Sequence, residues 1–277
     1  MNENVSKSRT AVITIIGFLV ALIFLFPIIW FIFSSFKPSA ELFTYPLSLF
    51  PKSWSLGNYV SVLQHGFMRY VYNSAFVAVV ATAICVAVSS AAGYGLAVYR
   101  RDVKSANVFF AIFLMGTLVP GDAQIVAKFD VIMHVGLFNN IWGVILPTVA
   151  STTGIFLYRQ FFTTVPMSLV EAARIDGASE AKIFFTIMFP LAKATTVTLI
   201  IFSFVWRWND YLLPLVVLSD QDSFTIQIAV RNYIGNMNTD WNSILAATVL
   251  SIIPLIIVFA FLQKHIMGGI ATSGMKN

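Results

Sequence analysis

The chain has 277 residues, of which 58% are hydrophobic, 15% aromatic and only 10% charged. Soluble domains carry about 25% charged residues, so 17 basic and 12 acidic side chains are too few to cover a water-soluble chain of this length. The net charge of +5 and the isoelectric point of 9.4 come from dispersed basic residues, which disfavours nucleic-acid binding. With a mean hydropathy of +0.83, the chain is predicted to be an integral membrane protein.

Six stretches are predicted to cross the membrane as helices, because each is close to the roughly 20 apolar residues that a span needs. Four of them are long and free of charge, 105–121 is shorter, and the stretch from about 195 to 218 carries Arg207 and Asp210. The runs are solidly apolar rather than alternating, which excludes an outer-membrane barrel. The first run exceeds the core of a signal peptide, so it is predicted to be retained. The expected spans of this all-α fold are 11–36, 72–99, 105–126, 139–162, 195–218 and 242–264.

The distribution of Lys and Arg predicts how these spans are oriented. The set of loops that includes the tails, 1–10 and 265–277, holds eleven cations: Lys7, Arg9, Arg100, Arg101, Lys104, Arg159, Arg174, Lys182, Lys193, Lys264 and Lys276. The other set holds five: Lys37, Lys52, Arg69, Lys128 and Arg231. We therefore expect both tails and the 165–194 loop in the cytoplasm, and the 37–69 and 219–241 loops outside.

Motifs for catalysis or metal binding are absent from the sequence. Cys85 is the single cysteine, which excludes an internal disulfide and a CxxC site, and His65, His134 and His265 lie far apart. HExxH, GxSxG and the GxxxxGK[ST] phosphate loop are also missing. We expect no enzyme activity and no bound cofactor, so any use of ATP must come from a partner.

The second span carries a stripe of small residues at a spacing of four: Ala83, Ala87, Ala91 and Gly95. A stripe of this kind lets another helix backbone approach closely. It indicates packing rather than a substrate.

The 165–194 loop has a clear helical pattern. Ser168 followed by Glu171 fits a capping box that starts a helix just after Pro166. Gly177 then interrupts the helix, and Ser179 can cap a second helix running through Phe185. Pro190 is expected to end or kink that helix. The loop is therefore predicted to be helix, Gly turn, helix, projecting from the membrane.

The first of these helices presents small and apolar residues framed by charge, a surface that can enter a groove on a partner. Alanine lets the backbone sit deep, and Gly177 permits a turn and close approach. The alternative is a hairpin that only packs on its own bundle. The residues concerned are Glu171, Ala172, Ala173, Arg174, Ile175, Asp176 and Gly177.

The loop resembles the EAA loop of ABC importer permeases, whose pattern is EAA-x3-G-x9-I-x-LP. Glu171-Ala172-Ala173, Gly177, Ile187 and Phe189-Pro190 match it, with Phe189 in place of Leu. The resemblance covers nearly the whole chain. Carbohydrate importer permeases, of the type of the second permease subunit of the maltose system, have similar sequences in four further segments. These are 174–179, 208–211, 214–218 and the tail from Gln263-Lys264 to Gly268-Gly269.

This resemblance implies a type I importer in the cell membrane of a bacterial-type cell. Its partners would be a second permease in a heterodimer, two cytoplasmic ATPase subunits that use ATP and Mg, and an external substrate-binding protein. Residues 171–177 would be the coupling helix that docks on the ATPase. The implied function is uptake of a carbohydrate, in particular an oligosaccharide, by alternating access. The alternatives are a permease for a non-sugar solute, a secondary carrier and a membrane enzyme.

A polar segment inside the fifth span is the candidate sugar path or gate. Charge inside a membrane span indicates a functional site, and aromatic and amide side chains suit sugar rings. The alternative is that Arg207 and Asp210 neutralise each other for packing. The candidate residues are Trp206, Arg207, Trp208, Asn209, Asp210 and Tyr211. The loop that follows holds Asp220, Asp222, Arg231, Asn236, Asn238 and Asp240, where the family implies contact with the binding protein.

Overall fold

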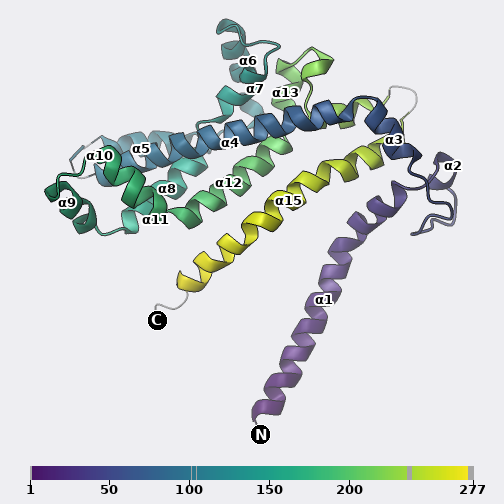
Figure 1. The fold of residues 1–277 in the computed structure, drawn as a ribbon, viewed down its shortest axis with the longest axis horizontal. Helices are drawn as coiled ribbons and strands as arrows, with labels where there is room; N and C mark the ends of the chain where they lie inside the picture. Colours follow the sequence, from purple (N-terminus) through teal and green to yellow (C-terminus); the bar gives the residue numbers. More distant parts are fainter. Residues whose placement is uncertain (1, 101, 104, 236–238, 274–277) are drawn as a thin grey trace. The chain divides into compact units, whose positions relative to one another are not determined.

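The computed structural model describes residues 2–100, 102–103, 105–235 and 239–273, with side chains from residue 9 to 263 within these ranges. In these residues the regular elements are all helical, and an isolated bridge pairs Ile234 with Thr239. The chain forms two compact units (Figure 1), which are residues 1–67 with 230–253 and residues 68–229 with 254–277.

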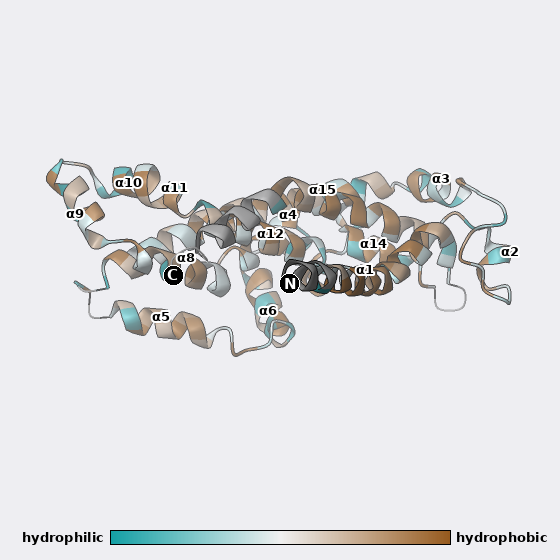
Figure 2. Cartoon of the chain, turned by 90° about the horizontal axis from the view of Figure 1, so that it is seen from below, coloured by the Kyte–Doolittle hydropathy of each residue, from teal (hydrophilic) through white to brown (hydrophobic). Residues whose placement is uncertain are grey.

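The first unit contains α1 (Asn2–Ser34), α2 (Ser39–Leu42), α3 (Gly57–Gln64) and the first part of α15 (Trp241–Ser273). The apolar window of α1 has a mean hydropathy of 3.0 and none of it is buried within the chain. Figure 2 shows the brown colour of hydrophobic residues along α1. A surface of this kind needs lipid or another protein to cover it.

Lys37 organises the stretch that follows α1. Its side chain is only 1% exposed, and its Nζ donates to the carbonyl oxygen of Ser48. Its own carbonyl accepts hydrogen bonds from Asn58 Nδ2 at 2.9 Å and from Asn242 Nδ2 at 2.8 Å. The Lys37 carbonyl thus joins the end of α1 to α3 and α15, while its ammonium binds the loop at Ser48.

The second unit is built around α4 (Phe67–Val98), whose Val98 end lies beside α9 and α10 in Figure 1. The other elements assigned wholly or mainly to it are α5 (Ala106–Met115), η1 (Asp122–Gln124), α6 (Ile125–His134), α7 (Ile141–Ile145), η2 (Leu146–Thr148), α8 (Thr152–Thr164), α9 (Met167–Ile175), α10 (Glu180–Ile183), η3 (Phe184–Met188, a π-helix), α11 (Phe189–Leu191), α12 (Lys193–Trp208), α13 (Leu212–Val217), η4 (Gln221–Ser223) and α14 (Ile226–Asn232).

Helices α4, α8 and α12 pack closely because glycine and small polar residues line their contacts. A Cβ placed on Gly93 would lie 2.6 Å from the Cβ of Tyr158 on α8. The Tyr158 hydroxyl in turn shares a 2.7 Å hydrogen bond with Thr196 of α12, and Thr82 donates to Ser203 at 3.0 Å. Small residues and hydroxyl pairs are the means by which helices associate in lipid, where apolar burial contributes little.

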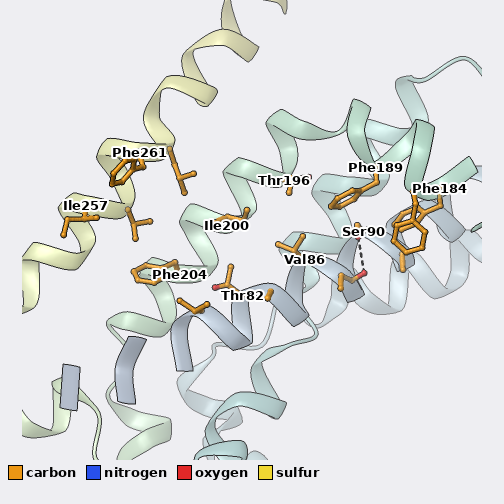
Figure 3. A pocket seen from close by; sticks show the side chains of 17 residues that line it. Thr82, Val86, Ser90, Phe184, Phe189, Thr196, Ile200, Phe204, Ile257 and Phe261 are labelled. Atoms are coloured by element: carbon orange, nitrogen blue, oxygen red, sulfur yellow. Dashed lines mark hydrogen bonds between the residues drawn. The ribbon is translucent and has the colours of Figure 1, made fainter. Parts of the chain in front are cut away.

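The stripe of small residues on α4 lies elsewhere. Ala83, Ala87 and Ala91 are exposed and line an apolar groove of about 770 Å³ (Figure 3), whose other walls are η3, α11, α12 and residues 257–262 of α15. Gly95 is not among the lining residues, and a Cβ there would meet nothing within 4 Å. The close contacts of α4 with α8 occur instead at Gly93 and at Ser89, which meets Gly154.

Four helical stretches in the described residues are long and apolar enough to cross a membrane: 9–34, 67–98, 141–164 and 241–263. A fifth is possible if the pair 180–191 and 193–208, bent by 77°, forms one span. Helix α5 has only 10 residues, or about 15 Å, which is half of a hydrocarbon core of about 30 Å. Helix α5 thus covers only part of the expected span over 105–126, and the span itself stays a prediction. The count of six spans and the cytoplasmic termini stay predictions.

Candidate functional site

The 165–194 loop begins its first helix where the sequence predicts, but not through the predicted cap. Helix α9 starts at Met167, directly after Pro166, whose extended backbone (φ −59°, ψ 127°) holds the N-cap position. No side chain caps this end. Ser168 is instead the second helical residue and is exposed, so the predicted capping box is wrong.

Gly177 ends α9 in the predicted turn. It has a positive φ of 77°, the left-handed region that glycine enters without steric cost. The Gly177 amide donates to the carbonyl of Arg174, and the Ala178 amide donates to that of Ala173, both at 3.0 Å. This pair of bonds is a Schellman motif, which satisfies the last carbonyls of a helix.

The second helix is capped as predicted, and its far end is distorted. Ser179 accepts a hydrogen bond from the Lys182 amide at 3.4 Å, which caps α10. The regular helix ends at Ile183 rather than Phe185 and continues as a π-helix, with the Phe189 amide bonded to the Phe184 carbonyl. Pro190 has no amide hydrogen and would clash with the carbonyl one α-turn earlier, which the wider turn relieves. The chain then bends by 77° before α12.

The exposed surface of α9 and its turn is close to the predicted one. Glu171, Ala172, Ile175, Asp176 and Gly177 are all exposed, and the Ile175 side chain is 86% exposed. Val170 on the opposite face is fully buried in the core that α4 and α8 share. The helix is thus anchored by one face and presents an apolar residue on the other.

Arg174 and Ala173 depart from this surface, since both are half-buried. The Arg174 Nε donates to Glu180 Oε1 at 2.6 Å, so its charge turns back to α10. Tyr94 of α4 donates from its hydroxyl to Glu180 Oε2 at 2.9 Å. Neither Tyr94 nor Glu180 is among the predicted site residues, because no helical spacing relates Glu180 to residues of α4 or α9.

The polar segment of the fifth expected span is a break between two helices. Helix α12 ends at Trp208 and α13 begins at Leu212, with Asp210 Oδ1 accepting from the Leu213 amide at 3.4 Å. This carboxylate therefore caps α13. Polar backbone at such a break is tolerated in a membrane only where protein or a water-filled cavity covers it.

The candidate path residues do not share one surface. Trp208 is buried and Arg207 is directed into the protein, where it donates to the carbonyls of Ser203, at 3.2 Å, and Thr148. Among the described residues no ion pair joins Arg207 to Asp210, so the structure does not form the neutralising pair.

The other candidate residues face outward or are half-buried. Trp206 is 49% exposed and stacks on Phe202, with ring centroids 5.8 Å apart. Asn209 is also exposed and Tyr211 is half-buried. Phe202, Trp206 and Asn209 thus form one exposed stripe on α12.

The loop after α13 is fixed to α4 and to the turn before α7. Asp222 forms an ion pair with Arg69, and Asn73 Nδ2 donates to the Asp222 carbonyl at 2.9 Å. Asn139, in the left-handed region at φ 54°, accepts from the Ser219 and Asp220 amides, each at 3.0 Å.

Other charged residues predicted in this part of the chain have local roles or are not described. Asp240 caps α15 by accepting from the Ser243 amide, and Arg231 donates to the Ile234 carbonyl. Asn236 and Asn238 of the same loop lie outside the described residues. Three of the predicted cations also lie outside them, and these are Arg101, Lys104 and Lys276.

The described residues are all helical, and their fold is that of the type I permease subunits of ABC importers. The chain belongs to the family of binding-protein-dependent transport system inner membrane components, whose profile matches residues 91–271. Permeases of this family act in the inner membrane together with ATPase subunits and substrate-binding proteins, and they are generally non-catalytic.

Two relatives match nearly end to end. The arabinooligosaccharide transport system permease protein AraQ of Bacillus subtilis (strain 168) is 33% identical over 268 residues, which are 95% of each chain. The sn-glycerol-3-phosphate transport system permease protein UgpE of Pectobacterium atrosepticum is 32% identical over 271 residues, again 95% of each chain.

Two crystal structures share the fold. One is a bacterial ABC transporter involved in the import of the acidic polysaccharide alginate, with a TM-score of 0.83, 24% identity, and coverage of 95% of this chain and 98% of that chain. The other is the inward-facing MetNI methionine ABC transporter, with a TM-score of 0.57, 15% identity, and coverage of 73% and 95%.

Proposed function

We propose that this chain is a permease subunit through which an ABC importer moves a carbohydrate, and in particular an oligosaccharide, into the cytoplasm. The observation that carries the proposal is the exposed part of residues 171–177, which presents Ile175 and two carboxylates. The helix is held to the protein by the buried Val170 and by the ion pair of Arg174 with Glu180. The relatives that carry oligosaccharides or glycerol phosphate by name support the solute class. The second candidate is a non-sugar solute such as a sugar-like phosphate ester, which the glycerol-3-phosphate relatives favour.

The proposed assembly has a second permease as heterodimer partner, two cytoplasmic ATPase subunits that use ATP and Mg, and an external binding protein. Residues 171–177 dock in a groove on the ATPase. The short side chain of Ala172 and the lack of a side chain at Gly177 let the backbone sit deep in that groove, and the Ile175 side chain buries apolar surface there. Closure of the ATPase pair then switches the permease between two access states.

Replacement of residues 171–177 by a Gly/Ser stretch is expected to remove the ATPase from the purified complex. The stretch deletes the apolar Ile175 contact and the helix that presents it, while the spans keep their apolar sequence. The measurement is co-purification of the chain with a candidate second permease and ATPase. A matched control replaces the exposed residues 117–121 by Gly/Ser, because this stretch also lies outside the long helices.

Two outcomes would contradict the proposal. Retention of the ATPase by the Gly/Ser variant would show that residues 171–177 are not the docking surface. If the wild-type chain never retains an ATPase while the permease pair is intact, the importer assignment fails and an ion-driven carrier takes its place.

We place the sugar path along the exposed stripe of α12 that Phe202, Trp206 and Asn209 form. Stacked aromatic faces bind the apolar faces of sugar rings, and an exposed amide can bind their hydroxyls. The apolar groove of Figure 3 is a poor sugar site, because its lining is almost entirely hydrocarbon. The buried Trp208 and the inward-directed Arg207 then support the helix break rather than contact the sugar.

Trp206→Ala is expected to lower sugar uptake roughly twofold to tenfold at limiting substrate, which corresponds to one aromatic contact of about 0.5–1.5 kcal/mol. Trp206→Phe keeps an aromatic face and is expected to retain most of the uptake. The measurement is initial uptake of labelled oligosaccharide by the complete transporter. Equal uptake by the alanine and phenylalanine variants and wild type would place the path elsewhere.

A further inference from the structure

The carboxylate of Glu180 joins two helices that are far apart in the sequence. Its Oε1 accepts from Arg174 Nε at 2.6 Å, and its Oε2 accepts from the Tyr94 hydroxyl at 2.9 Å. Arg174 lies in the last turn of α9, next to the exposed docking surface, whereas Tyr94 lies near the end of the long helix α4. One carboxylate therefore connects the docking surface to a transmembrane helix through an ion pair with Arg174 and a charge-assisted hydrogen bond from Tyr94.

Tyr94 is held rigidly at its end of this connection. It is 7% exposed, and its ring lies between Phe162 of α8, at a centroid distance of 6.0 Å, and Phe184, at 5.3 Å. Arg174 is likewise held, since its guanidinium lies 5.7 Å from the ring centroid of Tyr99. Neither end can swing freely, so a displacement of α9 must strain these contacts or move α4 with it.

The charge state of the carboxylate suits a permanent connection. The hydrogen bond from Arg174 holds the pKa of Glu180 at about 2, below its ordinary 4.5, although partial burial opposes this shift. Because the pKa of Glu180 is lower in the folded chain than its ordinary 4.5, its bonds stabilise the folded loop at pH values above 4.5. This stabilisation is lost as the pH falls from there through about 2. Glu180 thus accepts both bonds throughout the physiological range.

We infer that Arg174, Glu180 and Tyr94 form a positioning link that carries movement of α9 to α4 when the ATPase subunits close. This inference rests on the proposed function, because it assumes that α9 docks on an ATPase. It differs from docking itself, since Glu180 and Tyr94 lie behind the exposed surface. Removing the link should therefore separate ATP hydrolysis from uptake without releasing the ATPase.

The test uses the complete transporter with Tyr94→Phe or Glu180→Gln in this chain. Tyr94→Phe removes only the hydroxyl, and Glu180→Gln removes the charge while keeping the shape of the side chain. We expect both variants to retain the ATPase and to hydrolyse ATP, but to move at least about fivefold less solute per ATP, the lower end of typical coupling between sites. The double variant should be no worse than the stronger single variant, because both break one link.

Tyr72→Phe is the matched control, because Tyr72 lies on the same helix, is 68% exposed and stacks on Phe76. It should behave as wild type. Unchanged solute per ATP in both link variants would overturn the inference while leaving the proposed function intact. Loss of the ATPase from the variants would also overturn it, since the residues would then only build the docking surface. Failure of the proposed function shows separately, as a wild-type complex that retains no ATPase.

Discussion

Gly177→Asp is expected to abolish uptake while leaving insertion of the chain into the membrane intact. The backbone at Gly177 is left-handed, and a Cβ there would meet nothing within 4 Å in this chain. Aspartate enters this region more readily than most residues, so the local turn should survive. The added carboxylate projects instead into the proposed ATPase groove beside Asp176. A buried unpaired charge costs about 3–5 kcal/mol, so ATPase binding should weaken by a factor of about 100 or more.

Two further variants separate charge from backbone strain. Gly177→Asn has nearly the same shape without the charge, and we expect it to keep more ATPase binding than the aspartate variant. Gly136→Asp places the same residue at another left-handed glycine, with φ 71° and open space around its Cβ, away from α9. It should transport normally. Membrane yield, ATPase retention and uptake are measured for all variants, and normal uptake by Gly177→Asp would refute the role assigned to the loop.

Local rules predicted the loop well where one residue determines the backbone. Gly177 ends α9 because a left-handed residue is needed there, and Ser179 caps α10 because its hydroxyl can reach an amide three residues on. The capping box failed because Pro166 takes the N-cap position with an extended backbone, which leaves Ser168 inside the helix. Two local signals competed for the same helix end, and the restricted backbone of proline prevailed.

Composition predicted where apolar helices occur but not where they break. The charge-free run over 105–121 is mostly apolar, yet its helix α5 ends at Met115, because hydropathy is insensitive to the turns that follow. The site shows a similar limit. The contact of Tyr94 with Glu180 spans 86 residues of sequence, so no periodic pattern could reveal it. Arg207 and Asp210 are three residues apart in the sequence, but α12 ends between them and each side chain has its own backbone partners.

Gly93→Ala is expected to destabilise the second unit more than any other change of one methyl group on α4. The new Cβ would lie 2.6 Å from the Tyr158 Cβ, 3.0 Å from the Arg159 amide nitrogen and 3.2 Å from the Tyr158 carbonyl carbon. Two of these atoms belong to the backbone of α8, and the third, the Tyr158 Cβ, is bonded to it. Rotation of a side chain therefore cannot relieve the clash, and α4 and α8 must move apart. Overpacking of this kind costs about 1–3 kcal/mol, and separation would also strain the hydrogen bond from Tyr158 to Thr196.

Gly95→Ala provides the matched control two residues along the same helix. Its Cβ would meet nothing within 4 Å, and alanine favours helix by up to about 1 kcal/mol over glycine, so stability should be unchanged or raised. The measurement is the thermal unfolding midpoint of each purified variant in one detergent, together with the yield of assembled transporter. A lower midpoint for Gly93→Ala alone identifies the contact of α4 with α8 as the cause. Equal midpoints would mean that the two helices can separate at no cost, which contradicts their close packing at Gly93.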